Sequence, residues 1–283
     1  MTPPRVLTIA GSDSSAAAGA QADLKTIAAR GAYGLCALTM LTAQNSTGIQ
    51  AIQRIPTEFI AQQIDSILTD IGADAVKTGL LLLAPTVQLV ADKVEQYHLK
   101  TLVVDPVLID GAGRQLVDAA TIRAYTDQLF PLATVVTPNL GEAAILVGHS
   151  IHTLAEMREA AVQIATYGSR WVVIKGGHAE SQPGDQSVDG ALSGAQVVDV
   201  LYDRETGQFY EFYTPRLPIA NARGAGCTFA SAIASELAKG QPIPAAVEIA
   251  KRFVFEALQA SANWKLGEGR GTLQHAYRLA GSL

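Results

Sequence analysis

The chain has 283 residues, of which 48% are hydrophobic and 17% are charged, and its formal net charge is −5 at pH 7. A large buried core is expected from this balance, and the acidic excess argues against binding to nucleic acids or to anionic membranes. Two cysteines, Cys36 and Cys227, exclude a framework of disulfides. The sequence does not open like a secretory signal, and no apolar run reaches the roughly 18 residues of a membrane span. We therefore expect a cytoplasmic protein without nucleic-acid or membrane partners.

Short β-branched runs alternate with longer helical patterns as far as Lys175. The runs predict strands at Val6–Ala10, Leu35–Leu41, Ala73–Thr78, Thr101–Val107, Thr134–Pro138 and Trp171–Lys175. The patterns between them predict helices near 20–30, 57–70, 85–97, 119–129, 140–147 and 154–167. Such alternation predicts an α/β fold of three αβα layers, with a mostly parallel central sheet and helices on both faces.

The pattern changes after Lys175, where residues rich in Gly, Ser, Asp and Gln predict a loop. The elements predicted beyond it are an antiparallel pair at Val197–Tyr202 and Phe209–Tyr213, and helices over 227–239 and 243–264. The tail beyond Gly267 shows little pattern. Because no polar linker or internal repeat divides the sequence, we expect one domain over residues 1–283.

Polar residues follow the carboxyl ends of the predicted strands, where open parallel sheets bind their ligands. They are Gly11-Ser12-Asp13, Gln44-Asn45, Lys77, Asp105, Asn139 and Lys175. Together these strand ends indicate a cleft. Lys175 precedes two glycines, so the backbone there can approach a ligand while the lysine meets a phosphate charge. Neither a Walker A pattern nor a G-x-G-x-x-G turn after the first strand occurs, which argues against dinucleotide binding of the common type.

The run NARGAGCTFASAIASELAK (221–239) places a glycine turn before a helix whose apolar residues recur every four positions from Phe229. The first amide N–H groups of a helix lack internal partners and carry partial positive charge. The turn Gly224-Ala225-Gly226 can therefore cradle an anion. Cys227 follows directly, in a position that stabilises a thiolate. The alternative is a close-packed helix entry in which Cys227 is a small core residue.

Eight stretches together carry a resemblance to a known family. They are VLTIAGSDSSAAAGAQADLKT (6–26), LTAQNSTGI (41–49), DAVKTGLL (74–81), VVDPV (103–107), VVTPNLGEA (135–143), VIKGGH (173–178), VLYD (200–203) and NARGAGCT (221–228). In order and spacing the chain resembles the hydroxymethylpyrimidine/phosphomethylpyrimidine kinases of thiamine biosynthesis. This family belongs to the ribokinase superfamily and is close to one class of pyridoxal kinases. The resemblance implies a ribokinase-like kinase domain.

The resemblance also implies a reaction, in which the γ-phosphoryl of Mg-ATP moves to a primary alcohol on an aminopyrimidine, and a second round gives the diphosphate. The backbone amides of Gly224, Ala225, Gly226 and Cys227 match the anion hole for the transferring phosphoryl. Cys227 also matches the catalytic position, and it can take the hydroxyl proton if the helix end and Lys175 lower its pKa. The remaining matches are Lys175, Asn139 and Thr228 for the nucleotide, and Asp105 and Glu142 for Mg²⁺ through water. Arg223 is a further candidate for the nucleotide, with a solvent-exposed side chain as the alternative.

For the acceptor, Gln44 matches the position that reads the pyrimidine, because its amide offers a donor and an acceptor to the ring edge. Asp23 and Gly11 match positions near the hydroxymethyl group, and Leu80 and Val107 are expected to form an apolar wall. The nearest rival acceptor is a vitamin B6 alcohol, since it is also a planar nitrogen heterocycle with a hydroxymethyl arm. A third hypothesis is a non-catalytic ligand-binding protein. The resemblance further suggests a homodimer and leaves activation by a monovalent cation open.

Most of these residues have structural alternatives. Asp13 and Asp105 can form turns, Gln44 can lie in a solvated loop, and Cys36 can be a core residue. Glu142 lies in the first turn of a helix, where a carboxylate is favoured, and Asp23 can act on the helix dipole through Arg30. Lys77 can form a structural ion pair. The five histidines form no cluster in the sequence, which argues against a histidine metal site.

The chain departs from the family pattern at two places. Ala16 and Ala17 stand where the family usually has glycines, which removes backbone freedom near the acceptor. Ala222-Arg223 stands where the family commonly has Thr-His, so Arg223 adds a fixed positive charge and five donors beside the predicted anion hole. The stretch 179–196 is longer than usual, and we expect a mobile flap over ATP there.

Overall fold

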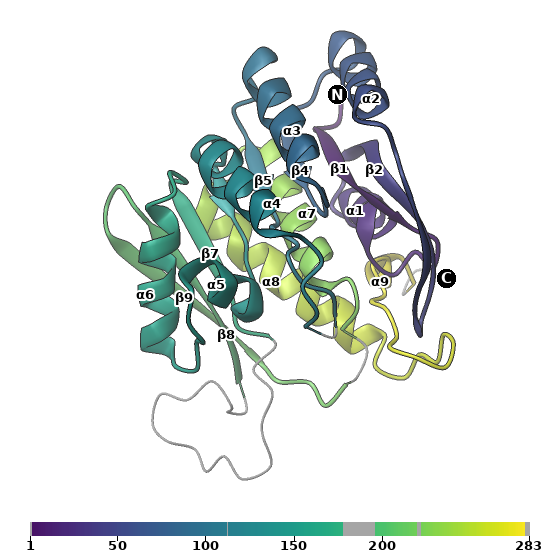
Figure 1. The fold of residues 1–283 in the computed structure, drawn as a ribbon. Coiled ribbons are helices and arrows are strands. Elements are labelled where there is room, and N and C mark those ends of the chain that lie inside the picture. The colour runs from purple at the N-terminus through teal and green to yellow at the C-terminus, as the bar shows by residue number, and fades with distance from the viewer. Residues whose placement is uncertain (1, 112, 178–195, 220–221, 281–283) are drawn as a thin grey trace.

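The computed structural model describes residues 2–111, 113–177, 196–219 and 222–280, without the side chains of the last two. Within these residues a nine-stranded sheet forms the middle layer (Figure 1). Its strands are β1 (Arg5–Asp13), β2 (Tyr33–Asn45), β3 (Gly48–Arg54), β4 (Ala75–Thr78), β5 (Leu102–Val104), β6 (Val135–Val136), β7 (Trp171–Lys175), β8 (Gln196–Asp203) and β9 (Gln208–Pro215). Their spatial order is β3-β2-β1-β4-β5-β6-β7-β8-β9. The strands from β2 to β7 in this order pair in parallel, and β3, β8 and β9 pair antiparallel.

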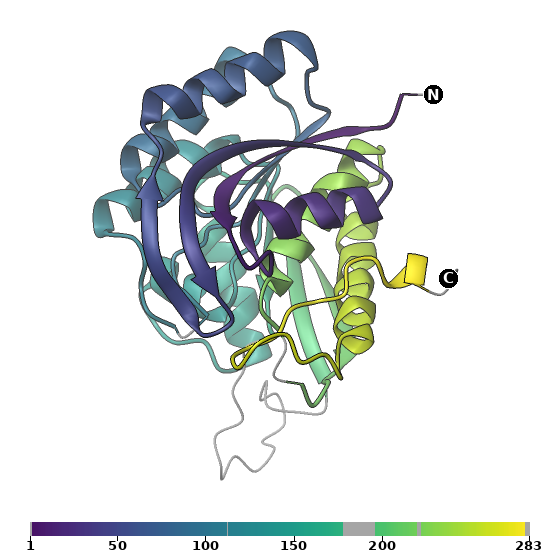
Figure 2. The same ribbon diagram turned by 90° about the vertical axis from the view of Figure 1, so that its right-hand side faces the viewer.

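Helices cover both faces of this sheet. They are α1 (Gly19–Ala29), α2 (Thr57–Asp70), α3 (Ala84–Gln96), α4 (Ala119–Ala124), α5 (Leu140–Val147), α6 (Leu154–Ala165), α7 (Ala225–Ala238), α8 (Ile243–Ala260) and α9 (Tyr277–Ala280). A π-helical turn, Tyr125–Leu129, and a 3₁₀ turn, Phe130–Leu132, continue α4. One apolar core lies under α2, α3 and α6, and the other lies under α1, α7 and α8. Figure 2 shows these two sets of helices on opposite sides of the sheet.

Strand β1 shows why the predicted strands read as continuous apolar runs. Successive side chains of a strand point to opposite faces, and both faces of this sheet are covered by helices. Leu7 and Ile9 therefore enter one core and Val6 enters the other. Thr8 shares the face of Val6 but donates its hydroxyl to Asp23 on α1, 2.6 Å away. The polar residue in an otherwise apolar strand thus marks a buried polar cluster.

The predicted α/β class and three-layer architecture are confirmed. The main difference is β3, which the sequence did not predict because it is an exposed edge strand with no apolar run. To pair with β3, β2 continues to Asn45, beyond the predicted end at Leu41. Cys36 on β2 is half-buried rather than in the core. The predicted flap over 179–196 lies, except for Gln196, outside the described residues.

Residues 267–275, which we call the C-terminal strap, run from the tip of the β2–β3 hairpin back to α8 and α7 (yellow in Figure 2). At the hairpin tip the N–H of Gly269 donates to Ser46 Oγ, 3.1 Å away. At the other end His275 is buried and its Nε2 lies 2.9 Å from Thr228 Oγ1 in the first turn of α7. The patternless tail therefore buttresses the helix that carries the predicted anion hole.

Burial lowers the pKa of His275 to about 4, and the nearby charge of Lys25 acts in the same direction. The unfolded chain binds this proton near pH 6.5, so the stability that depends on the neutral imidazole is complete above pH 6.5 and is lost as the pH falls toward 4. Between pH 7 and 4.5 the free energy of unfolding should fall by about 2 kcal/mol more in the wild type than in His275→Gln. Urea unfolding at the two pH values measures this, and equal falls in both proteins would contradict it.

Candidate active site

The entry to α7 requires glycine at its N-cap. Gly224 has a φ of +86°, and a Cβ there would lie 1.9 Å from the carbonyl oxygen of Ala17, so no other residue fits. The helix then begins at Ala225 and packs on β1, β4 and β5. A Cβ on Gly226 would lie 3.2 Å from Lys175 Nζ, which places an ammonium group at the first turn. The N–H of Ala225 donates to Ala222 O at 3.2 Å, so the N–H groups that follow it in the first turn, together with this cation, form the candidate anion site.

Lys175 is held by groups that follow two neighbouring strands, β5 and β6. Its Nζ lies 2.8 Å from Asp105 Oδ1, and its backbone N–H donates to Pro138 O at 2.9 Å. The same carboxylate oxygen accepts from Thr137 Oγ1 at 3.3 Å. Burial favours loss of the lysine proton, but Asp105 and Glu142 outweigh it and raise the pKa of Lys175 above its ordinary value. Lys175 is therefore a charged ammonium group at neutral pH, poised to meet an anion at the α7 entry.

Glu142 and Asn139 form a capping box at the start of α5. The N–H of Glu142 donates to Asn139 Oδ1 at 2.9 Å, and the N–H of Asn139 donates to Glu142 Oε2 at 2.8 Å. Burial raises the pKa of Glu142 to about 8, with Asp105 adding to the rise and Lys175 opposing it. Glu142 therefore has the structural role that the sequence analysis gave as its alternative, that of an acidic residue in the first turn of a helix. Its carboxyl group also lies near Asp105, where the sequence analysis placed the two metal positions.

Lys77 and Asp23 form a second buried ion pair, with Lys77 Nζ 2.9 Å from Asp23 Oδ2 and neither side chain exposed. Ser231 of α7 also donates to Asp23, at 2.8 Å. The expected ion pair of Lys77 is confirmed. The prediction that Asp23 binds the acceptor is wrong. Its carboxylate has no exposed surface, and both oxygens already accept hydrogen bonds from protein side chains. The helix-dipole role through Arg30 is also wrong, since Arg30 pairs with Glu236 at 2.6 Å.

Members of both buried pairs act on the thiol of Cys227, and its ionisation differs from the prediction. Burial raises the pKa of its thiol to about 11, and Asp23 and Asp105 raise it further, whereas Lys77 and the N–H of Gly19 act in the opposite direction. The prediction that the helix end and Lys175 lower the pKa of Cys227 is therefore wrong for the free protein. The two carboxylates near the thiol offset the two lysines, and desolvation then decides the outcome. Cys227 is a neutral thiol at pH 7.

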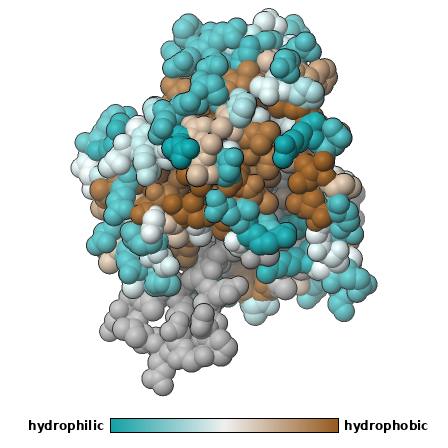
Figure 3. Space-filling model, viewed as in Figure 1, coloured by the Kyte–Doolittle hydropathy of each residue, from teal (hydrophilic) through white to brown (hydrophobic). Residues whose placement is uncertain are grey.

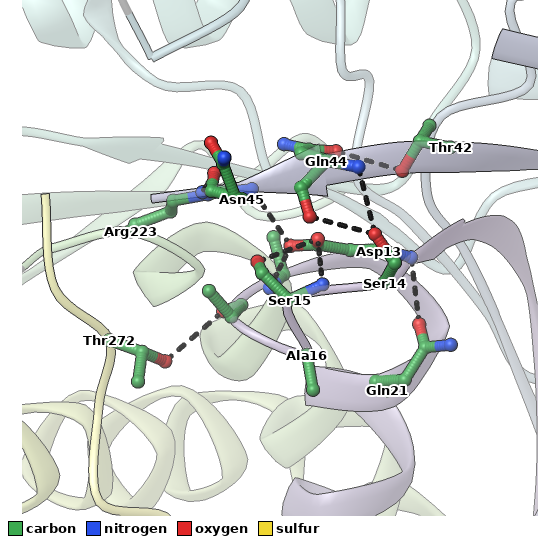
Figure 4. Close-up of polar contacts among 12 residues, drawn as sticks. Asp13, Ser14, Ser15, Ala16, Gln21, Thr42, Gln44, Asn45, Arg223 and Thr272 are labelled. Atoms are coloured by element: carbon green, nitrogen blue, oxygen red, sulfur yellow. Dashed lines mark hydrogen bonds and ion pairs between the residues drawn. The ribbon is translucent and has the colours of Figure 1, made fainter. Parts of the chain in front are cut away.

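The predicted acceptor residues stand at the carboxyl ends of four adjacent strands, β2, β1, β4 and β5. They are Gln44, Gly11, Leu80 and Val107, all of them half-buried. Gln44 is fixed through its backbone, whose N–H and carbonyl groups both bond to Ser14 Oγ, at 2.8 and 2.7 Å (Figure 4). Its side-chain oxygen accepts from Thr42 Oγ1 at 3.0 Å. The strand ends thus bring an amide and two apolar side chains to one edge of the sheet.

Two residues predicted for the nucleotide lie elsewhere. Arg223 binds Asp13 and the carbonyl of Asn45, so its side chain lies on the side of the acceptor residues (Figure 4). Thr228 is fully buried and its hydroxyl pairs with His275, so it faces away from any ligand. The prediction for Arg223 rested on its closeness in sequence to the glycine turn and that for Thr228 on the family resemblance, and neither fixes where a side chain points.

A buried pair missed by the sequence analysis holds the turn after Lys175. The N–H of Gly176 donates to Asp199 Oδ1 at 2.9 Å, and Lys251 of α8 lies 2.9 Å from Asp199 Oδ2. A Cβ on Gly176 would lie 2.1 Å from the carbonyl oxygen of Val198. One signal was present in the sequence, because Asp199 interrupts an apolar strand and Lys251 lies on the apolar stripe of a helix.

Comparison with known proteins identifies the family. The family described as phosphomethylpyrimidine kinase matches residues 13–274. The chain belongs to this family. The thiamine biosynthesis bifunctional protein ThiED of Geobacter sulfurreducens is 42% identical over 95% of the chain, which spans about half, 52%, of that relative. The hydroxymethylpyrimidine/phosphomethylpyrimidine kinase of Mycobacterium tuberculosis is 41% identical, over 99% of the chain and 96% of the relative.

The solved structures agree with this family. An ADP complex of Bacillus subtilis pyridoxal kinase superposes with a TM-score of 0.87 and 37% identity, covering 98% of this chain and 99% of that one. The predicted family and the ribokinase-like kinase fold are thus confirmed. Among the described residues no helix has the length and apolar character to cross a membrane, and no cluster of three or more His, Cys, Asp or Glu offers a metal site.

The thiol of Cys227 gives a test by pH. Because kcat/KM reports ionisation of the free enzyme, a neutral thiol of pKa about 11 that acts as the base makes kcat/KM rise with pH from 6 to 9. In Cys227→Ser we expect kcat to fall at least roughly tenfold, the KM of the acceptor to change less than about threefold, and this rise with pH to disappear. Steady-state assays of ADP release measure all three quantities. A flat wild-type profile would show that the thiol does not take the proton.

Proposed function

We propose that the chain phosphorylates the hydroxymethyl group of 4-amino-5-hydroxymethyl-2-methylpyrimidine with ATP, and then phosphorylates the monophosphate to the diphosphate in thiamine biosynthesis. The convergence of the α7 entry with the ammonium group of Lys175 carries this proposal. Phosphoryl transfer needs mostly positioning and charge stabilisation, and both are provided at this point. The names of the relatives support the substrate. We further propose that residues 1–283 act as one kinase domain.

In this proposal the amides of Gly224, Ala225, Gly226 and Cys227 hold the γ-phosphoryl group, and Lys175 neutralises its oxygens. The bond between the acceptor oxygen and phosphorus forms as the bond from phosphorus to the leaving oxygen of ADP breaks. The hydroxyl proton passes in the same step to Cys227 Sγ, which accepts it in its thiolate form and becomes the neutral thiol. Asn139, which begins α5 next to Lys175, remains a proposed contact of the nucleotide.

Mg²⁺ fits the donors on the nucleotide side. Asp105 and Glu142 are two carboxyl groups that lie close enough to raise one pKa through the other, and Mg²⁺ is commonly bound by one or two carboxylates, waters and phosphates. These two residues would hold the ion through water, and the ion would neutralise charge on the nucleotide phosphates. Burial and Asp105 raise the pKa of Glu142 to about 8. The charge of a bound cation would act in the opposite direction and favour loss of the proton of Glu142.

For the acceptor, we propose that the free edge of the Gln44 amide pairs with the amino-pyrimidine edge, with Gly11 beside the hydroxymethyl group. Leu80 and Val107 would form the apolar wall. One alternative has a specific support, since the structure of B. subtilis pyridoxal kinase superposes closely on this chain. A vitamin B6 alcohol is therefore the second candidate substrate.

Steady-state kinetics with the two alcohols separates these substrates. We expect kcat/KM for the aminopyrimidine alcohol to exceed that for pyridoxal by at least about tenfold, because an amide can match both a donor and an acceptor on the pyrimidine edge. A preference for pyridoxal of similar size would replace the first substrate by the second. Tight binding of either alcohol without ADP release would instead favour a non-catalytic protein.

Gln44→Ala is the matched variant for this comparison. It should remove most of the preference for the aminopyrimidine and leave the KM for ATP within about twofold, because the amide side chain lies at the end of β2 while Lys175 ends β7. The opposite pattern, with ATP affected and the acceptor preference kept, would place the acceptor elsewhere.

We also propose a homodimer in which β3 takes part. This strand is an edge of the sheet and carries exposed Ile49 and Ile52, next to exposed Leu41 on β2. Hydrophobic surface lies over this hairpin on the right of Figure 3. Light scattering should give twice the mass of the chain and a lower mass for Ile52→Lys, because a charge on the strand disfavours edge pairing. A single-chain mass for the wild type would contradict the dimer.

The cytoplasmic location, the absence of nucleic-acid partners and the monovalent cation stay predictions.

A further inference from the structure

The turn between β1 and α1, residues 14–18, contains a non-glycine residue in the left-handed backbone region. Ala16 has a φ of +57°, a conformation in which the Cβ of an L-residue is strained. The turn is also confined, because the carbonyl oxygen of Ala17 lies against the α carbon of Gly224 at the α7 entry. Contacts from the surrounding protein therefore have to hold this shape.

Asp13 organises the 14–18 turn from within (Figure 4). Its Oδ1 accepts from the N–H and the hydroxyl of Ser15, at 2.9 and 2.7 Å, and its Oδ2 accepts from the N–H of Ala18 at 3.0 Å. Its carbonyl oxygen accepts from the N–H of Ala16 at 2.8 Å. The carboxylate is only 3% exposed, and a charge buried this deeply needs an opposite charge beside it.

Arg223 supplies that charge. Its Nη2 lies 3.0 Å from Asp13 Oδ2, and its Nη1 donates to the carbonyl oxygen of Asn45. Asn45 directly follows Gln44 at the end of β2, and Arg223 directly precedes Gly224, the N-cap of α7. A single planar guanidinium group therefore joins the strained turn, the end of the acceptor strand and the entry to the phosphoryl cradle.

We propose that Arg223 is a positioning residue that holds the 14–18 turn in its left-handed shape and fixes Gln44 relative to the amides of α7. The role of Gln44 in this inference rests on the proposed function. Arg223 acts through Asp13 and the carbonyl of Asn45, and it need not touch either substrate. Because the bond to Asp13 offsets the strain at Ala16, the two residues should be coupled: a glycine at position 16 makes the turn less dependent on the guanidinium group.

A double-mutant cycle tests this coupling. Arg223→Ala should lower kcat/KM for the acceptor roughly 10- to 100-fold, chiefly through KM, and leave the KM for ATP within about twofold. Ala16→Gly alone should change kcat/KM by less than about threefold, and in its background the loss from Arg223→Ala should shrink at least about fivefold. Lys25→Ala is the matched control, since Lys25 also binds this turn, at Ala16 O, but is exposed. We expect it to change kcat/KM by less than about twofold.

Arg223→Lys supplies a conservative arm. It keeps the charge near Asp13 but lacks the fork that also reaches Asn45, so its kcat/KM should lie between those of the wild type and Arg223→Ala. If Arg223→Ala does not fold, this variant and the variant that combines Arg223→Ala with Ala16→Gly carry the test. Equal losses from Arg223→Ala in both backgrounds, or a loss confined to the KM for ATP, would overturn the inference.

The melting temperatures of the same variants give a second readout of the coupling between Arg223 and Ala16. This readout needs no substrate, so it separates the inference from the proposed function. A wild type that prefers pyridoxal, with the coupling intact, contradicts only the proposed substrate. A wild type that prefers the aminopyrimidine, with no coupling in either readout, contradicts only the role of Arg223.

Discussion

The site depends on the close approach of the first turn of α7 to the carboxyl ends of the central strands. Gly224 permits that approach, because its neighbour Ala17 leaves no room for a Cβ. Two buried ion pairs, Lys77 with Asp23 and Lys175 with Asp105, lie near this turn, and members of both pairs act on the pKa of Cys227. Such pairs add little net stability, but removal of one partner leaves a buried charge at a cost of about 3–5 kcal/mol. They fix the electrostatics of the site rather than the fold.

The charges in this region nearly balance in the free protein. Two ammonium groups face the carboxylates of Asp23 and Asp105, and burial raises the pKa of Glu142, so that this third acidic group gives up its proton less readily. The neutral thiol of Cys227 belongs to the same balance. An arriving phosphate group therefore meets a region without excess negative charge, where the N-terminus of α7 adds partial positive charge. The helix dipole alone does not make a thiolate here, because burial and two carboxylates outweigh it.

Much of the architecture could be predicted from the sequence, because buried parallel strands leave uninterrupted β-branched runs and their polar ends mark the ligand edge. Lys175 and Asp105 were found in this way, and the glycine turn was found from the helical periodicity of the residues that follow it. The edge strand β3 and the C-terminal strap were not, since an exposed strand and a segment held by distant contacts carry no periodic pattern. The direction of a side chain was equally hidden. Arg223 and Thr228 flank the glycine turn in sequence, yet one reaches the acceptor strand and the other reaches His275.

A crystal structure with a non-hydrolysable ATP analogue and the aminopyrimidine alcohol would test the central claim most directly. The terminal phosphorus should lie at the start of α7, with its oxygens about 3 Å from the amide nitrogens of residues 225–227 and from Lys175 Nζ. The hydroxymethyl oxygen should point toward that phosphorus from the side of Gln44. A terminal phosphate bound away from α7, with the amides of this turn facing only solvent, would contradict the account.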